Sequence, residues 1–448
     1  MSATASDRGR ADARRAHHHS RALGPYRGVR RIRTVGYVTT GDATITDVDG
    51  LDQLIQMLRS RGHQTWGPVE RQGAIGPAPI SGAADLPVGC HDRQQPGSYE
   101  LHHDDDDPEL FGWAVGPGSW KARLLPASQN VWVAPPGGPA TVGRPPDGDA
   151  ATTLAMVGVR PCELAAMSVL DHVLADAAVP DPDYLQRRSG TWVIVAECTR
   201  PAETCFCSSM GTGPAVDSGY DVALTELPGG RSGEPRPGEP HPEGAGAADL
   251  GHRFLLRAGS ERGAQLLQQL STTRAAGDAD WDERERALEQ ARRVMVRSVD
   301  PQEARDLLAR SIDHPRWEAV AERCLACGNC TMVCPTCFCT DLRDGSDLQA
   351  MTYRTRTWAS CFDPDHSNLH GGPVRRSTAS RYRQWLTHKL STWWDQFGSS
   401  GCVGCGRCIT WCPVGIDLTE EVAAIRAEQD AGESADRDAD RAREVPQP

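Results

Sequence analysis

Two stretches of the sequence carry four cysteines each, at the same spacing. They are Cys324-Leu-Ala-Cys327-Gly-Asn-Cys330-Thr-Met-Val-Cys334-Pro335 and Cys402-Val-Gly-Cys405-Gly-Arg-Cys408-Ile-Thr-Trp-Cys412-Pro413. Both fit C-x2-C-x2-C-x3-C-P, the pattern that holds [4Fe–4S] cubanes. Three thiolates three residues apart can each reach a different iron, while a glycine between them allows close backbone approach and a positive φ. The two runs therefore predict two [4Fe–4S] clusters.

The fourth cysteine of each run is expected to bind the cluster of the other run, as in two-cluster ferredoxins. One cluster would then be held by Cys324, Cys327, Cys330 and Cys412, and the second by Cys402, Cys405, Cys408 and Cys334. This exchange would tie the two halves together and keep the clusters close enough for electron transfer. Zinc is the alternative metal, but zinc sites more often use paired C-x2-C units than a run of four cysteines.

Further cysteines lie outside the two runs. Four of them could gather in the N-terminal half: Cys162, Cys198, Cys205 and Cys207. Cys162 and Cys198 each follow a predicted strand, and loops after parallel strands meet at one edge of a sheet. We predict a third iron–sulfur cluster there, with ordinary buried cysteines as the alternative. Cys337, Cys339 and Cys361 lie between the runs, where free thiols and a further metal site both remain open.

The elements that must position these cysteines suggest an α+β protein, with an N-terminal α/β sheet domain followed by a mainly helical dicluster ferredoxin domain. Strands are predicted over 33–39, 131–134, 152–159, 191–196, 221–225 and 253–257, and helices over 48–59, 162–174, 281–310 and 380–393. Strands that alternate with helices are typical of an α/β sheet. The expected organisation is a disordered tail (1–30), the α/β domain (31–310) with a disordered insertion (228–248), the helical domain (315–427) and a disordered tail (428–448).

The composition favours a cytoplasmic protein that interacts with other proteins. Sixteen cysteines in 448 residues, without a signal-peptide pattern, indicate metal binding rather than disulfides. The net charge of −12 does not favour nucleic-acid binding, and no run reaches the roughly 18 apolar residues of a membrane span. Of 48 basic residues only Lys121 and Lys389 are lysines, so each could serve as a compact charge near a cluster.

Motifs for small-molecule catalysis are missing from the sequence. It contains no G-x-G-x-x-G after a predicted strand, no phosphate-binding G-x4-G-K-[ST] and no H-E-x-x-H. The chain is therefore expected to have no catalytic residues of its own. If hydride chemistry occurs, a partner protein would supply the flavin and nicotinamide sites.

Several segments together resemble the beta subunit of cytoplasmic [NiFe] sulfhydrogenases, with the electron-transfer subunit of anaerobic sulfite reductase as a close relative. The segments are Val157-Gly-Val-Arg-Pro-Cys162-Glu-Leu, Glu203-Thr-Cys205-Phe-Cys207, Cys334-Pro-Thr-Cys337-Phe-Cys339, Arg383-Gln-Trp-Leu-Thr-His388-Lys389 and the second cysteine run. The resemblance extends over residues 33–425. It implies an electron relay between a flavin subunit that handles NAD(P)H and a [NiFe] hydrogenase or sulfite-reducing subunit. A zinc-stabilised scaffold without redox function is the alternative from another class.

Overall fold

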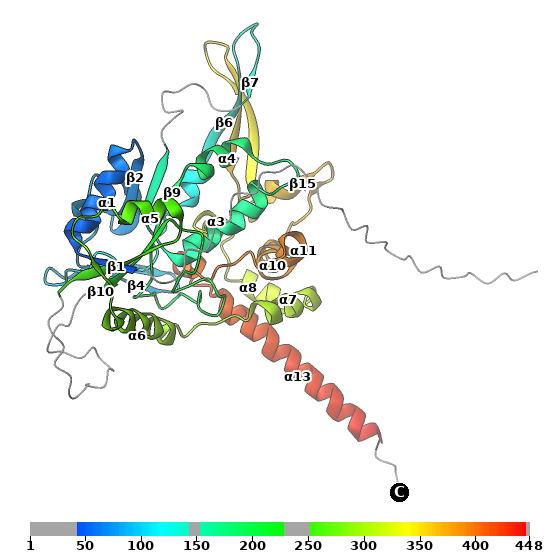
Figure 1. Cartoon of the computed structure of the whole chain (residues 1–448). Coiled ribbons are helices and arrows are strands. Elements are labelled where there is room, and N and C mark those ends of the chain that lie inside the picture. Colours follow the sequence, from blue (N-terminus) through cyan, green and yellow to red (C-terminus); the bar gives the residue numbers. More distant parts are fainter. Residues whose placement is uncertain (1–42, 143–152, 228–250, 445–448) are drawn as a thin grey trace, which may run out of the picture.

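The computed structural model describes residues 43–142, 153–227 and 251–444, in which a sheet region precedes a mainly helical region (Figure 1). This arrangement confirms the predicted α+β fold class. The strand expected over 33–39, the insertion over 228–248 and the tail over 1–30 lie outside the described residues.

The N-terminal region is built on an eight-stranded mixed sheet. Its strands, in sheet order, are β12 (Arg274–Ala275), β1 (Ala43–Thr46), β11 (Arg253–Ala258), β10 (Val222–Leu227), β9 (Trp192–Ala196), β8 (Leu154–Val159), β2 (Gln64–Arg71) and β3 (Ala74–Pro79). Strands β2, β8, β9 and β10 run parallel, and the outer strands pair antiparallel. Every residue of β9 is buried, as expected for a central strand covered on both faces.

Helices cover this sheet, and their sequences show why they form. In α1 (Val48–Ser60), Asp47 caps the N-terminus by accepting a hydrogen bond from Gly50 N, and the helix buries Leu51, Leu54, Ile55 and Leu58. This i, i+3, i+4, i+7 spacing forms the apolar stripe of a core-facing helix. The other helices of this region are α2 (Lys121–Leu124), α3 (Pro161–Leu174), α4 (Pro182–Ser189) and α5 (Glu261–Leu267), with η1 (Ala83–Asp85) and the β4–β5 hairpin (Cys90–Gln95, Ser98–His103).

A second sheet joins the two regions and corrects one expectation. The strand predicted over 131–134 is present as β6 (Ser128–Ala134), but it belongs to a separate four-stranded sheet rather than to the α/β sheet. It pairs with a hairpin between the two cysteine runs, formed by β13 (Thr340–Ser346) and β14 (Thr352–Trp358), and with β7 (Thr141–Val142). Threonine and aromatic residues are frequent along β14, which suits a strand.

The helix predicted over 281–310 is two helices, α6 (Asp278–Val294) and α7 (Pro301–Arg310). Asp300 adopts an extended conformation and caps α7, and Pro301 takes the first helical position. A proline inside a continuous helix would remove a backbone hydrogen bond and clash with the preceding turn. The single-helix prediction was wrong because it did not weigh this proline.

The C-terminal region packs short helices around a core that includes Trp317, Trp385, Leu386 and Leu390. Its elements are α8 (Arg316–Ala321), α9 (Asn329–Met332), η2 (Pro364–Ser367), the β15–β16 pair (Asn368–Leu369, Gly372–Pro373), α10 (Thr378–Thr387), the π-helical η3 (His388–Thr392), α11 (Trp393–Phe397), α12 (Arg407–Thr410) and α13 (Leu418–Glu444). The helix expected over 380–393 thus runs from α10 through η3 into α11. No helix in the described part combines the length and apolar character needed to cross a membrane.

The last helix differs from the expected polar tail. Helix α13 continues to Glu444 and projects away from the body of the molecule (Figure 1). Its first turns are anchored by Val422 and Ile425, which are buried in the core. The following residues are rich in alanine, glutamate and arginine, which favour a helix even without packing.

Candidate metal centres

The two cysteine runs adopt the same local backbone. Gly328 and Gly406 have φ values of 77° and 74°, and each directly precedes a short helix, α9 or α12. Two residues upstream, Ala326 and Gly404 also have positive φ, at 50° and 63°. The positive φ predicted for the two glycines is confirmed. This repeated loop curls each run around one centre, the shape required for several cysteines to face one cluster.

Cys412 of the second run lies at the cavity of the first run. This cavity has a volume of about 30 Å³, and its lining includes Cys324, Cys327 and Cys330 of the first run together with Cys408 and Cys412 of the second. The aromatic residues Phe362, Tyr382 and Trp385 form part of its wall. Burial raises the pKa of Cys324, and the thiol of Cys412 raises it further. Burial disfavours the charged thiolate form of these cysteines. A bound metal group would compensate that charge, so these cysteines fit a metal group that binds thiolates.

Cys334 of the first run lies with the cysteines of the second run. Burial raises the pKa of Cys408, and the thiols of Cys402, Cys405 and Cys334 raise it further. Cys334 and Cys405 are buried, and the pKa of Cys402 rises to about 12, again mainly through burial. The eight cysteines of the two runs thus gather in one place, with Cys412 at the cavity of the first run and Cys334 beside the second run.

The two lysines of the chain converge on this second set. Lys389 Nζ lies 3.0 Å from Cys334 Sγ and 3.1 Å from Thr336 Oγ1. Lys121 Nζ donates to the carbonyl oxygens of Cys334 (2.8 Å) and Cys337 (3.1 Å) and lies 3.9 Å from the centre of the Trp358 ring. Both lysines are buried, and burial lowers the pKa of Lys121. Two cations beside the thiolates favour a more negative metal group.

The four cysteines of the N-terminal half also gather in one buried place. Cys162 begins α3 directly after β8, and Cys198 follows β9, so both lie at the carboxyl edge of two neighbouring parallel strands. Burial raises the pKa of Cys205, and Cys207 and Cys198 raise it further. Burial likewise raises the pKa of Cys162, with a further contribution from Cys207. The predicted convergence of these loops is therefore observed.

This group of four lies directly against the second run. Cys162, Cys207 and Cys405 share one hydrophobic cluster, and Cys205 Sγ lies 3.8 Å from the carbonyl oxygen of Cys405. Gly404 has no side chain, and a Cβ there would lie 2.7 Å from the backbone of Cys207. The glycine thus permits close approach of the two cysteine groups.

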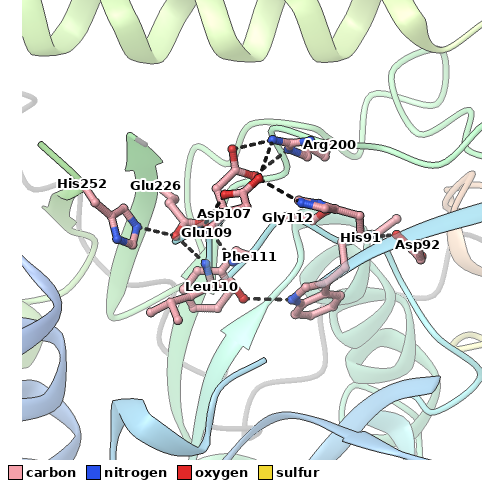
Figure 2. Close-up of polar contacts among 12 residues, drawn as sticks. His91, Asp92, Asp107, Glu109, Leu110, Phe111, Gly112, Arg200, Glu226 and His252 are labelled. Atoms are coloured by element: carbon pink, nitrogen blue, oxygen red, sulfur yellow. Dashed lines mark hydrogen bonds and ion pairs between the residues drawn. The ribbon is translucent and has the colours of Figure 1, made fainter. Parts of the chain in front are cut away.

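The loop between β5 and α2, residues 104–120, packs against this group of cysteines, and Figure 2 shows the polar contacts that fix its beginning. Arg200 pairs with Glu109 at 2.6 Å and with Asp107 at 3.5 Å. His91 Nε2 lies 2.9 Å from Asp107, and its Nδ1 donates to the carbonyl oxygen of Gly112 at 2.9 Å. Because Arg200 pairs with both carboxylates and His91 links Asp107 to Gly112, we interpret this acidic cluster as a structural anchor.

The same loop is held from the sheet by Glu226 of β10. Its carboxylate accepts hydrogen bonds from the backbone N–H groups of Leu110 and Phe111, each at 2.7 Å, and lies 2.7 Å from His252 (Figure 2). Further along, Ala114 packs on Cys205. Val115 of the loop packs in one cluster with Cys162 and Cys207, so the loop contacts three of the four cysteines.

A buried ion pair joins the two regions at the second run. The side chains of Glu163 on α3 and Arg407 on α12 form an ion pair, and each is only 3% exposed. Arg407 also donates to the carbonyl oxygens of Gly116 (2.7 Å) and Gly118 (3.1 Å). The sequence carries no local signal that marks Glu163 as the partner of Arg407.

Comparison with known proteins places these centres in a family. The family model for a 4Fe-4S dicluster domain matches residues 323–416. The chain is also 30% identical to sulfhydrogenase 2 subunit beta of Pyrococcus furiosus over 282 residues, which cover 62% of this chain and 75% of that protein. The chain belongs to the sulfhydrogenase beta-subunit family. This confirms the resemblance noted from the motifs and the iron–sulfur character of the C-terminal region. No solved structure matches this family member.

Proposed function

We propose that this sulfhydrogenase beta-family chain is an electron-transfer subunit with two [4Fe–4S] clusters in crossed ligation. One observation carries the proposal, namely that two cysteines of the second run, Cys408 and Cys412, line the cavity of Cys324, Cys327 and Cys330, and that Cys412 is the one that acts on the pKa of Cys324. When bound, such clusters take up and release single electrons. The exchange of the fourth cysteines would hold the two centres side by side.

The electrostatic surroundings support a redox role for the second centre. Lys389 contacts Cys334 Sγ directly, while Lys121 holds the backbone on both sides of Pro335 and Thr336 through its two carbonyl contacts. A buried ammonium beside a thiolate stabilises negative charge far more than an exposed one does. The lysines therefore favour the reduced, more negative state of this centre.

We further propose that Cys162, Cys198, Cys205 and Cys207 hold a third iron–sulfur cluster. Support comes from their burial, their mutual influence on pKa and their contact with the second run through Cys405. A C205A variant should lose about four irons per chain and keep the EPR signals of the two runs. Iron analysis of the anaerobically purified protein checks this result, with C90A as the control because Cys90 is buried in β4 outside all these groups. Unchanged iron in C205A would leave the four cysteines structural.

The family suggests which proteins could exchange electrons with this chain. We propose a relay in the cytoplasm between a flavin subunit that oxidises NAD(P)H and a [NiFe] hydrogenase subunit. Isolation of the native complex through a tag on this chain, followed by metal analysis, tests the proposal. Nickel and a flavin in the complex are expected. A sirohaem absorption band without nickel would favour the sulfite reductase branch, and isolation of the chain with zinc and no redox partner would favour a scaffold.

A further inference from the structure

A cavity beside both runs is lined by three cysteines that neither run uses. We call it the thiol pocket, the space lined by Cys337, Cys339 and Cys361. Its volume is about 170 Å³, against about 30 Å³ for the cavity of the first run. A water molecule needs about 10–15 Å³ by this kind of measure, so the thiol pocket has room for a group of many atoms.

The three cysteines are brought together by the β13–β14 hairpin. Cys337 and Cys339 precede β13, and Cys361 follows β14 after a short turn. The hairpin pairs Thr340 with Trp358, and Ala359 N donates to the carbonyl oxygen of Cys339 at 2.9 Å. An antiparallel register thus sets the separation of cysteines that are far apart in sequence. On the other side, the carbonyl oxygen of Cys337 is fixed by Lys121.

The remaining lining supplies basic and aromatic groups. Lys389 and His388 reach the thiol pocket from the π-helical η3, and Arg375 lines it from the preceding loop. Such π-helical turns inside helices occur often at functional sites. Trp393 closes the pocket against Phe338, with an edge-to-face ring contact at 5.5 Å. The cations Lys389 and Arg375 compensate part of the negative charge of a thiolate-bound metal group, whereas burial lowers the pKa of His388 and favours its neutral form.

The spacing of the sulfur atoms favours a cluster over a single metal ion. In the described parts of the chain, two groups of three possible ligand atoms lie within 4.8 Å of one another, and neither contains a cysteine of the thiol pocket or of the two runs. The three pocket cysteines therefore do not form the close group that one metal ion requires. Thiolates on different irons of a cluster lie farther apart than thiolates on one ion.

We propose that Cys337, Cys339 and Cys361 bind an additional iron–sulfur cluster in which one iron has no cysteine ligand. This cluster would lie next to the centre of the first run, because Trp385 lines both the thiol pocket and the first cavity. Electrons could therefore pass between the two. Lys389 likewise lines the pocket and contacts Cys334 of the second set. The inference rests on the proposed iron–sulfur function and adds a site to it.

The test uses the full-length chain purified anaerobically, with variants C339A and C361A and the control C90A. Each pocket variant should lose the same amount of iron and sulfide, up to about four of each per chain, together with one spectral component. The EPR signals of the two runs should remain. Iron contents equal to those of C90A and of the wild type would overturn the inference.

A second measurement on the wild-type protein does not depend on how the variants fold. The three cysteines are half-buried. Burial raises the pKa of Cys339 and Cys361, and a hydrogen bond with Cys334 together with burial raises the pKa of Cys337. Free thiols there should therefore react with iodoacetamide only at alkaline pH, where thiolate forms, and the labelling is done at that pH. We expect them to be protected in the iron-loaded protein and labelled after iron is removed with a chelator, as seen by peptide mass spectrometry. Labelling in the iron-loaded protein would overturn the inference while leaving the two-cluster relay intact. Absence of iron from the wild type would instead remove the proposed function itself.

Discussion

Replacing Cys412 with alanine should remove the cluster of the first run, although Cys412 belongs to the second. The cavity that Cys412 lines is shared with Cys324, Cys327 and Cys330, and Cys334 lies with the other three thiols. The aromatic wall of this cavity offers no other thiol that could bind the iron in place of Cys412. We expect a loss of about four of the roughly eight irons of the two runs, measured by iron and sulfide analysis together with EPR.

The comparison that decides this prediction uses two further single variants. If ligation is crossed, the EPR spectrum of C412A should match that of C324A, which affects the first centre only. It should differ from that of C402A, which affects the second. C90A serves as the control for loss of a buried thiol. A spectrum of C412A that matches C402A would show that each run binds its own cluster.

Glu163→Gln should lower the free energy of unfolding by about 3–5 kcal/mol, the cost of leaving one partner of a buried ion pair uncompensated. The substitution keeps the size of the side chain but removes the charge opposite Arg407. Glu163 also accepts hydrogen bonds from Ser119 Oγ (3.0 Å) and Trp120 N (3.2 Å), so its environment is built around a carboxylate. Urea unfolding of the iron-loaded protein, followed by circular dichroism, measures the change.

The matched control for this variant is Glu289→Gln on the exposed face of α6. Glu289 is 49% exposed and pairs with Arg293 at 3.2 Å and Arg292 at 3.4 Å. Exposed pairs of this kind contribute about 0–1 kcal/mol, so the unfolding midpoint should hardly move. Equal midpoints for the two variants would contradict a role of the buried pair in holding the two regions together.

Much of the sheet could be predicted from the sequence because its central strands are short, largely apolar and separated by helical segments. The strands expected over 152–159, 191–196, 221–225 and 253–257 appear as the neighbours β8, β9, β10 and β11. The pairing of strands that are far apart in the sequence was harder to predict. Nothing local in β6 indicates that its partner is β14, more than 200 residues later, because such pairing depends on how two regions pack.

The cysteine chemistry was the most predictable part of the site. Spacing alone indicated the crossed arrangement, and the rarity of lysine drew attention to Lys121 and Lys389, which both reach Cys334. The thiol pocket was not foreseen as a cavity, since it depends on the hairpin that returns Cys361 to Cys339. The partnership of Glu163 with Arg407 was also missed, because residues of opposite charge are common and only the fold selects this pair.

The most direct test of the central claim is iron and acid-labile sulfide analysis of the anaerobically purified chain, with EPR of the dithionite-reduced protein. We predict at least about eight irons and eight sulfides per chain. The EPR spectrum should show two reduced [4Fe–4S] clusters broadened by magnetic interaction, because the proposed crossed ligation would place the two centres side by side. Zinc in place of iron, with no EPR signal after reduction, would contradict the electron-transfer function.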